Sequence, residues 1–414
     1  MAYIFISQTH KLLLKMKNAF YLLLSAFTML FALNSCKTDE LDLDKTLKFS
    51  KLTVEEQKEK IEKSGIDFVD KMDGMQDTKA FKAGLQFIGK TDAAAAAPLK
   101  VLHADLKNRN TNVLRNFDRQ LRVSYVESEM WGEWEWKPAL NDFVLVKTLT
   151  NKAIYRFPAT ETSTTNNAEI TVVYVETDIQ VPDSEDYYPS SITYTMKVDG
   201  SKVMEAEFSG SYKSDGTPIK VKQTLVMGDY SWSAEINNKS TEASGTYEFK
   251  LKSETLVKME VTAKGDLIAE KYADAEYPDE FMQSGAIYFQ MMNIAILGGL
   301  KDMSAFVDDM NAISNTETRA GYEAQADVIN KHLICYGYYV DDNQKFADIE
   351  FYVLESSDYD INGDGKINSL DVEYSLQPRF VLSDGSKVDI QNYIETGFED
   401  LITKLEEYQD IVPQ

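Results

Sequence analysis

The pattern of apolar and polar positions changes its period along the chain. From Thr53 apolar residues recur on one helical face, with Thr53 and Glu56 placed as a capping box at the start. From about Val123 to Gly265 the period becomes two, which is the spacing of half-buried strands. Beyond Pro278 the helical period returns. The pattern predicts an α+β fold with a helical N-terminal part, a central antiparallel β meander, and a C-terminal α/β segment ending in an amphipathic helix.

The boundaries of these parts follow from the same pattern. The helical region covers 53–121 and includes two further predicted helices, Lys79–Ile88 and Leu99–Leu121. The meander covers 122–266, and turn residues divide it at intervals typical of antiparallel sheets. The predicted hairpin connections are Val198-Asp199-Gly200-Ser201, Ser214-Asp215-Gly216 and Asn237-Asn238. One curled or closed sheet is the simplest architecture for this segment.

The C-terminal region covers 267–414 and mixes helices with strands. Phe281–Leu297 is apolar nearly all round, which predicts a helix buried in the protein, and its acidic flanks argue against a membrane span. Thr316–Leu333 is a predicted helix. Lys345–Leu354 and Arg379–Leu382 are predicted to pair as strands. The last helix carries its apolar residues on one face, at Ile390, Tyr393, Ile394, Phe398, Leu401, Ile402 and Leu405.

A short apolar segment near the start of the chain has the layout of an export signal. Met16-Lys17-Asn18 form a basic n-region before the uncharged run Ala19–Leu33. The run is about fifteen residues long, which is shorter than the roughly 20 residues that a membrane-spanning helix needs. We therefore interpret 1–35 as a cleaved signal peptide with Met16 as the initiator, and a permanent transmembrane anchor is the less favoured alternative.

The end of this segment, Leu33-Asn34-Ser35-Cys36, resembles the lipobox of bacterial lipoproteins. The resemblance implies that the signal is cut before Cys36, that Cys36 carries fatty acyl chains such as palmitate, and that lipid anchors the chain to the outer membrane. The acidic stretch Lys37–Asp44 resembles the surface-export signal of lipoproteins from Bacteroidetes-type bacteria. An acidic solvated tether over 36–52 explains the same residues, so periplasmic and surface-exposed placement both stay open.

The net charge of the chain limits the classes of molecule that its surface can bind. The chain has a formal charge of −24, and because its first 35 residues hold three lysines and no acidic residue, the remainder carries −27. Such a surface repels nucleic acid and anionic lipid headgroups, and it attracts cations. Only two cysteines are present, Cys36 and Cys335, so no disulfide framework is predicted.

The segment 360–371 carries the most specific chemical motif in the sequence. Oxygen ligands stand at positions 1, 3, 5, 9 and 12 of a twelve-residue loop, a glycine stands at position 6, and a backbone carbonyl completes the set at position 7. The loop therefore predicts one Ca²⁺ as a structural cofactor. The predicted ligands are Asp360, Asn362, Asp364, Lys366 through its carbonyl, Asn368 and Asp371.

This loop resembles the EF-hand loop, and most closely its dockerin version, in which asparagine at position 9 and aspartate at position 12 are usual and a helix follows. Dockerins carry two such loops, and EF-hands have a helix before the loop. This chain has one loop, and the predicted strand Lys345–Leu354 precedes it. The resemblance thus favours calcium binding at a strand-to-helix connection over docking to a cohesin-like partner.

No catalytic constellation stands out in the exported part of the chain. Its histidines are His103 and His332, and neither has a His or Cys partner at zinc-ligand spacing. His332 and Cys335 can be drawn as a thiol with a nearby base, but a half-buried histidine beside a core cysteine is the favoured interpretation. No residue is assigned a catalytic role, and the sequence leans against an enzyme.

The run Trp131-Gly132-Glu133-Trp134-Glu135-Trp136 is the second candidate site. In a strand Trp134 and Trp136 share one face, and the two glutamates share the other. Indole faces beside carboxylates suit glycan binding, but a core stripe of the sheet also explains them and is favoured. We therefore expect a membrane-anchored surface lipoprotein with a structural calcium loop. The alternative is a glycan-binding or glycan-hydrolysing lipoprotein, which requires solvent-exposed indoles.

Overall fold

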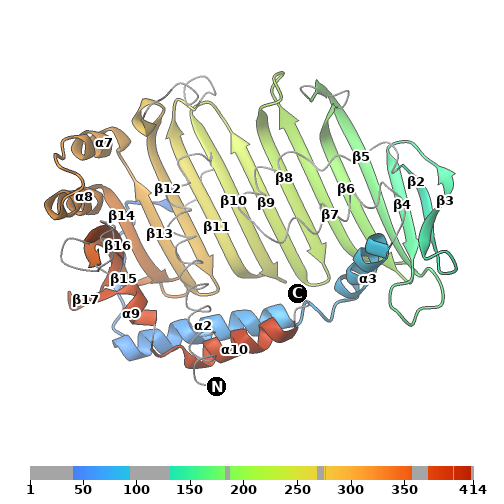
Figure 1. The fold of residues 1–414 in the computed structure, drawn as a ribbon, viewed down its shortest axis with the longest axis horizontal. Coiled ribbons are helices and arrows are strands. Elements are labelled where there is room, and N and C mark those ends of the chain that lie inside the picture. Colours follow the sequence, from blue (N-terminus) through green and yellow to red (C-terminus); the bar gives the residue numbers. More distant parts are fainter. Residues whose placement is uncertain are drawn as a thin grey trace, which may run out of the picture. The chain divides into compact units, whose positions relative to one another are not determined.

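Strands dominate the computed structural model (Figure 1), which describes residues 41–93, 131–181, 187–267, 275, 277–356, 372–394 and 396–411. The strands of these residues belong to one mixed sheet of 17 strands. The predicted α+β layout is therefore wrong, because strands also make up most of the C-terminal region that was expected to be mixed α/β. Among the described residues the N-terminal helices are α2 (Val54–Asp73) and α3 (Lys79–Ala93). The predicted helix Leu99–Leu121 lies outside the described residues.

Contacts divide the chain into two compact units. The first unit consists of the chain up to Phe68, Lys239–Thr246, and the chain from Val257 onward. The second unit consists of Val69–Asn238 and Tyr247–Leu256. Helix α2 and strands β10 (Glu242–Leu251) and β11 (Glu254–Gly265) contribute residues to both units.

The second unit is an antiparallel meander with one exception near its start. Strand β2 lies between β3 and β4, antiparallel to β3 and parallel to β4. From β4 to β9 each strand pairs antiparallel with the next. The strands are β2 (Gly132–Lys137), β3 (Asp142–Thr148), β4 (Lys152–Phe157), β5 (Ala168–Gln180), β6 (Tyr187–Val198), β7 (Ser201–Tyr212), β8 (Pro218–Met227) and β9 (Tyr230–Asn238).

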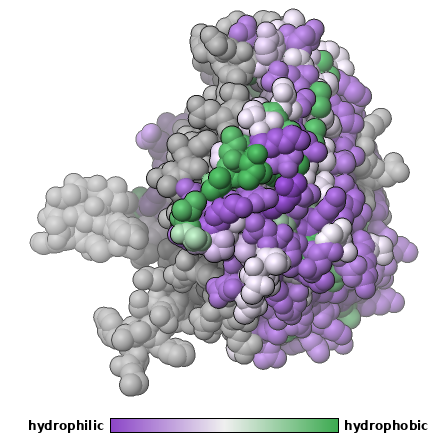
Figure 2. Space-filling model, turned by 90° about the vertical axis from the view of Figure 1, so that its right-hand side faces the viewer, coloured by the Kyte–Doolittle hydropathy of each residue, from purple (hydrophilic) through white to green (hydrophobic). Residues whose placement is uncertain are grey.

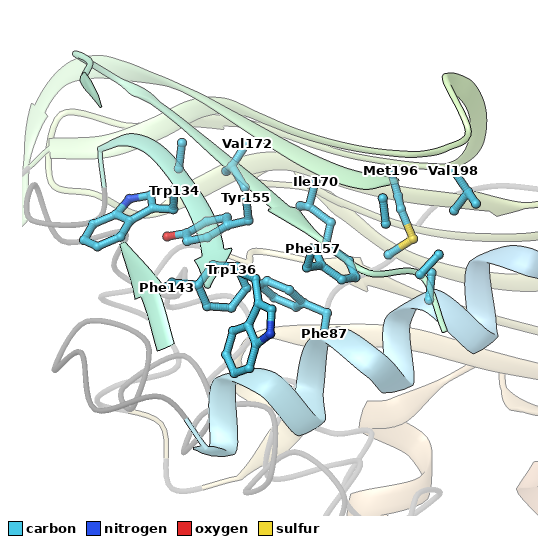
Figure 3. Packing of buried hydrophobic residues seen from close by; sticks show 14 of the residues in the cluster. Phe87, Trp134, Trp136, Phe143, Tyr155, Phe157, Ile170, Val172, Met196 and Val198 are labelled. Carbon is cyan, nitrogen blue, oxygen red and sulfur yellow. The ribbon is translucent and has the colours of Figure 1, made fainter. Parts of the chain in front are cut away.

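Helix α3 covers the aromatic end of this unit. Its Phe87 points into a cluster of rings on the sheet (Figure 3), with ring centroids 5.6 Å from Tyr155 and 5.2 Å from Phe157. Alternate residues of β5, Ile170 and Val172, extend the cluster, as the period of two in the sequence predicts. The helix therefore attaches to the sheet through one large side chain that is surrounded by aromatic neighbours.

The first unit is a second antiparallel meander, running from β11 to β17. The short strand β1 (Lys48–Phe49) pairs parallel with the first residues of β15. The remaining strands are β12 (Met282–Met291), β13 (Ile294–Leu300), β14 (Leu333–Tyr339), β15 (Gln344–Ser356), β16 (Glu373–Val381) and β17 (Lys387–Asp389). A one-turn 3-10 helix, η5 (Pro278–Glu280), precedes β12.

Four helices of this unit are α7 (Met303–Asn311), α8 (Arg319–His332), α9 (Ile390–Ile394) and α10 (Glu399–Ile411). Helices α2 and α10 run side by side (Figure 1), and the Glu62 carboxylate accepts the backbone N–H groups of Asp400 and Leu401 at 3.0 and 3.1 Å. A Cβ added at Gly65 would lie 2.6 Å from Leu401, so glycine permits this close approach.

The predicted buried helix Phe281–Leu297 is wrong, because this segment forms the hairpin β12–β13. Both faces of the hairpin are covered: Tyr288 and Leu297 belong to one apolar cluster, while Met282 belongs to another. A strand buried on both faces shows no apolar–polar alternation. The turn is Met292-Asn293, with Met292 at φ 52°, a left-handed conformation that non-glycine residues rarely adopt, and it contains neither glycine nor proline.

The predicted terminal helix is also interrupted, since α9 and α10 are separate and Gly397 between them has φ 82°. The predicted connection Asn237-Asn238 is wrong, because both residues belong to β9. Two other local predictions are confirmed. The capping box of α2 forms, with the Thr53 N–H donating to Glu56 Oε2 at 2.8 Å and the Glu56 N–H donating to Thr53 Oγ1 at 3.3 Å. The turn between β6 and β7 uses Asp199 and Gly200, both at positive φ.

Candidate functional site

The predicted calcium loop connects two paired strands. Residues 360–371 lie outside the described residues, as does Cys36. The chain on both sides is described: β15 ends at Ser356, β16 begins at Glu373, and these two residues are direct partners in an antiparallel pair. The segment that holds the motif is therefore the connection of a β hairpin. The expected strand-to-helix connection is wrong, because a strand follows the loop, and this is a further departure from the dockerin pattern.

Helix α8 fixes the base of this hairpin. The Asn330 side chain donates to the Phe351 carbonyl at 2.8 Å and accepts from the Phe351 N–H at 2.6 Å. β14 pairs with β15 only as far as Asp348. Beyond that point the Asn330 side chain forms the backbone hydrogen bonds of Phe351 that a neighbouring strand would otherwise form. The rings of Tyr322 on α8 and Tyr374 on β16 lie 6.0 Å apart. Both strands below the loop thus contact one helix.

Charge near the loop is partly balanced. Arg319, near the start of α8, contacts Glu355 at 3.1 Å and Glu323 at 3.0 Å. Hydrogen bonding to Glu323 is the main cause that raises the pKa of Arg319, so the guanidinium stays charged. Glu355 is the residue before the last residue of β15, and this cation therefore offsets one carboxylate at the foot of an acidic loop.

A second ionic group lies further along the same strands. Glu350 on β15 accepts from Arg379 on β16 at 2.6 Å and contacts Lys387 on β17 at 2.7 Å. Burial opposes ionisation of Glu350, but the hydrogen bonds from Lys387 and Arg379 prevail and lower its pKa. Tyr352 donates a short hydrogen bond to Asp389. These charges neutralise one another across three strands, which suits a structural role for the group.

Gly132–Trp136 of the predicted run lie in β2, and the indoles of Trp134 and Trp136 face the core. Trp134 is 9% exposed and Trp136 is 5% exposed, and both pack in the cluster around Phe87 (Figure 3). Glu133 is on the opposite face, where Arg156 at 3.0 Å is the main cause that lowers its pKa. The core interpretation of the indoles is confirmed. A sugar ring has no access to stack on them, so the glycan alternative loses the observation that motivated it.

His332 and Cys335 do not form a reactive pair. His332, the last residue of α8, places Nε2 2.6 Å from Asp309 Oδ2 on α7, and Lys331 contacts the same oxygen. Burial raises the pKa of the Cys335 thiol to about 12. A thiol with so high a pKa is a poor nucleophile at neutral pH. The predicted half-buried histidine is confirmed, and it has a carboxylate partner that the sequence spacing did not reveal. Cys335 lies in β14 with intermediate exposure, so the core position predicted for it is confirmed only in part.

The described residues offer little else that could hold a ligand. A cavity of about 40 Å³ in the first unit is lined by apolar groups of β11–β13 and by Met303, which leaves room for no more than small molecules of solvent. Within the same residues no three His, Cys, Asp or Glu side chains converge as a metal site would require. None of the helices in this part of the chain is long and apolar enough to span a bilayer.

Comparison with protein-family models, with curated proteins and with solved structures finds no match for this chain. The candidate site is therefore defined by its residues alone. It consists of the twelve-residue motif and the described frame around it, which is the β15–β16 hairpin together with α8.

Proposed function

We propose that this chain is an exported lipoprotein, anchored to the outer membrane through lipid on Cys36 and exposed at the cell surface, whose β sheet serves as a rigid binding or structural body. We further propose that one calcium ion at 360–371 closes the β15–β16 hairpin. The observation that carries the calcium proposal is the pairing of Ser356 with Glu373. The lipid anchor rests on the sequence that ends at Cys36.

A loop of this type needs its two ends close together, because positions 1 and 12 both coordinate the ion. Directly opposite residues of an antiparallel pair have Cβ atoms about 4.5–5.5 Å apart. Asp360 follows Ser356 by four residues and Asp371 precedes Glu373 by two, so the pairing of Ser356 with Glu373 supports a loop whose two ends are close. The ion then offsets the repulsion among the loop carboxylates and joins the two strands.

Calorimetry and thermal melting test the calcium site in the full-length chain. We expect one site with a dissociation constant of about 0.1–1 mM, the range of extracellular modules. At about ten times that concentration of free calcium, binding stabilises the fold by roughly 1.4 kcal/mol. Asp360→Ala and Asp364→Ala should remove this stabilisation and leave the calcium-free melting temperature nearly unchanged.

The matched control is Glu317→Ala, which removes an exposed carboxylate of the same unit outside the motif. This variant should respond to calcium as the unmodified chain does. Coincident melting curves with calcium and with chelator, together with no heat of binding at millimolar calcium, would show that the motif is only an acidic turn.

Metabolic labelling with a fatty acid tests the anchor. The unmodified chain and Cys335→Ser should both incorporate label, whereas Cys36→Ser should not. The labelled chain should stay with the membrane fraction at alkaline pH, which removes peripheral proteins. Equal labelling of Cys36→Ser would end the lipoprotein proposal and leave the calcium proposal untouched, since the two rest on different residues.

A further inference from the structure

Strand β3 forms an exposed apolar edge of the second unit. Among the described strands its partner is β2, on one side. Leu145 is 43% exposed, Val146 is 48% exposed, and Leu140 in the preceding turn is 66% exposed. Figure 2 faces this end of the molecule and shows apolar surface beside hydrophilic areas. A strand edge of this kind presents N–H and C=O groups that can pair with another strand.

A β-bulge determines which side chains of β3 share a face. Trp134 pairs with Leu145 and Glu133 pairs with Lys147, so Val146 is an extra residue in β3. Directly paired residues of neighbouring strands share a face of the sheet. The odd-numbered residues of β2 are paired with β3 as Lys137–Asp142, Glu135–Val144 and Glu133–Lys147. Asp142, Val144 and Lys147 therefore lie on one face, and Phe143 and Leu145 lie on the other.

This arrangement is complementary to itself. When a second β3 lies antiparallel alongside the first, with Val144 opposite Val144, Phe143 comes opposite Leu145. Val146 is the extra residue of the bulge and takes no partner. Asp142 of each copy therefore comes opposite Lys147 of the other, and both side chains lie on the same face. The two-fold axis thus creates two pairs of opposite charge, and it places the exposed Leu145 of each copy beside the buried Phe143 of the other. A shift of one residue would place side chains of opposite faces together and lose both.

We propose that two copies of this chain associate edge to edge through β3, in the register centred on Val144. The charged groups are available for this contact. Lys147 is 63% exposed at its side chain and lies 3.4 Å from Glu133, a long surface pair that leaves the ammonium free to reach a second carboxylate. Asp142 uses Oδ1 to accept the N–H of Phe143. The association depends on neither the lipid nor the calcium loop.

Cysteine crosslinking in intact cells tests the register. Val144→Cys is introduced into the full-length chain, which is expressed with two different epitope tags in one bacterial culture and oxidised. The two-fold axis places residue 144 opposite itself, at a distance that a disulfide spans. The matched control is Val226→Cys, since Val226 is 47% exposed on β8, a strand with a partner on each side.

We expect the Val144→Cys chain to give a band of twice the mass that carries both tags, several times stronger than that of Val226→Cys. Equal yields from the two variants, or a crosslinked band of another mass, would overturn the proposal, and the second outcome would indicate a different partner at this edge.

Charge reversal in the Val144→Cys background tests the pairing of Asp142 with Lys147. Asp142→Lys and Lys147→Asp each place like charges opposite one another, and each should reduce crosslinking about fivefold. The double variant restores opposite charges and should restore crosslinking. Tryptophan fluorescence of each variant reports whether the second unit is folded, since all four tryptophans lie there. Folded single variants that crosslink undiminished, or a folded double variant without recovery, would overturn the register.

Discussion

Ser356 and Glu373 stand directly opposite each other at the end of the β15–β16 pair. Ladder pairing continues from there to Asp348 and Val381, so the two strands form a regular hairpin of nine residue pairs. The connection between them holds the predicted calcium motif. Because the two strands pair without calcium, the entropy cost of closing this connection is already included in the folding of the hairpin. Calcium should therefore tighten a hairpin that is formed without it, which predicts a structural rather than a switching role.

Hydrogen exchange should detect this tightening. Amides at the loop end of the hairpin, around Glu355 and Tyr374, open locally and exchange through that opening. At about ten times the dissociation constant, free calcium should slow their exchange roughly tenfold. The hairpin β6–β7, with its Asp199-Gly200 turn, serves as the internal control and should exchange at the same rate with and without calcium. Uniform slowing of both hairpins would mean that calcium acts elsewhere.

Removal of the Phe87 ring should strongly destabilise the second unit. Phe87 is 7% exposed and contacts Phe143, Tyr155 and Phe157. Truncation of a buried phenylalanine to alanine costs about 3–5 kcal/mol. Urea unfolding followed by tryptophan fluorescence measures the change in this unit. On the same helix Leu85 is 46% exposed, so Leu85→Ala is the matched control and should cost less than about 1 kcal/mol. Similar losses from both variants would contradict this attachment of α3.

Some elements could be predicted from the sequence because their signals are local. The capping box at Thr53 and Glu56 and the turn at Asp199-Gly200 each satisfy backbone groups within a few residues, so a window of sequence contains the whole cause. Gly397 was such a signal too. It stands inside the predicted terminal helix and takes a positive φ that ends the continuity of α9 and α10.

Other features depended on contacts between distant residues. Whether Phe281–Leu297 is a helix or a hairpin depends on its neighbours β11 and β14, which bury it from the sides, and its turn at Met292 carries no glycine. The contact of Asp309 with His332 joins residues 23 positions apart. The strand that follows the predicted calcium loop also depended on a distant contact, because β16 is defined by its pairing with β15.

The Cys335 thiol should react very slowly in the folded protein. Burial raises its pKa to about 12, so the thiolate that attacks disulfide reagents is scarce at neutral pH. Reaction with a chromogenic disulfide should be at least about a hundredfold slower than after unfolding in urea. Val226→Cys, with its thiol on an exposed position, should react at once and shows that the reagent is active. Rapid reaction of Cys335 in the folded chain would mean that β14 is open to solvent.

The last prediction concerns acid stability and the contact between α7 and α8. Hydrogen bonding from Lys331, followed by that from His332, lowers the pKa of Asp309 below its ordinary value of 3.8. A carboxyl whose pKa is lower in the folded state contributes stability above the unfolded pKa, and this contribution is lost as the pH falls through the folded pKa. Asp309→Asn should therefore be less stable than the unmodified chain at neutral pH, and the difference should shrink below about pH 4.

Urea unfolding at a series of pH values measures this difference. Asp308→Asn is the control, since Asp308 is the exposed neighbour on the same helix turn. The difference in unfolding free energy between Asp308→Asn and the unmodified chain should not become smaller as the pH falls. A difference for Asp309→Asn that stays constant down to about pH 3 would mean that the side chain acts through packing. The carboxylate would then not be what holds Lys331 and His332 against α7.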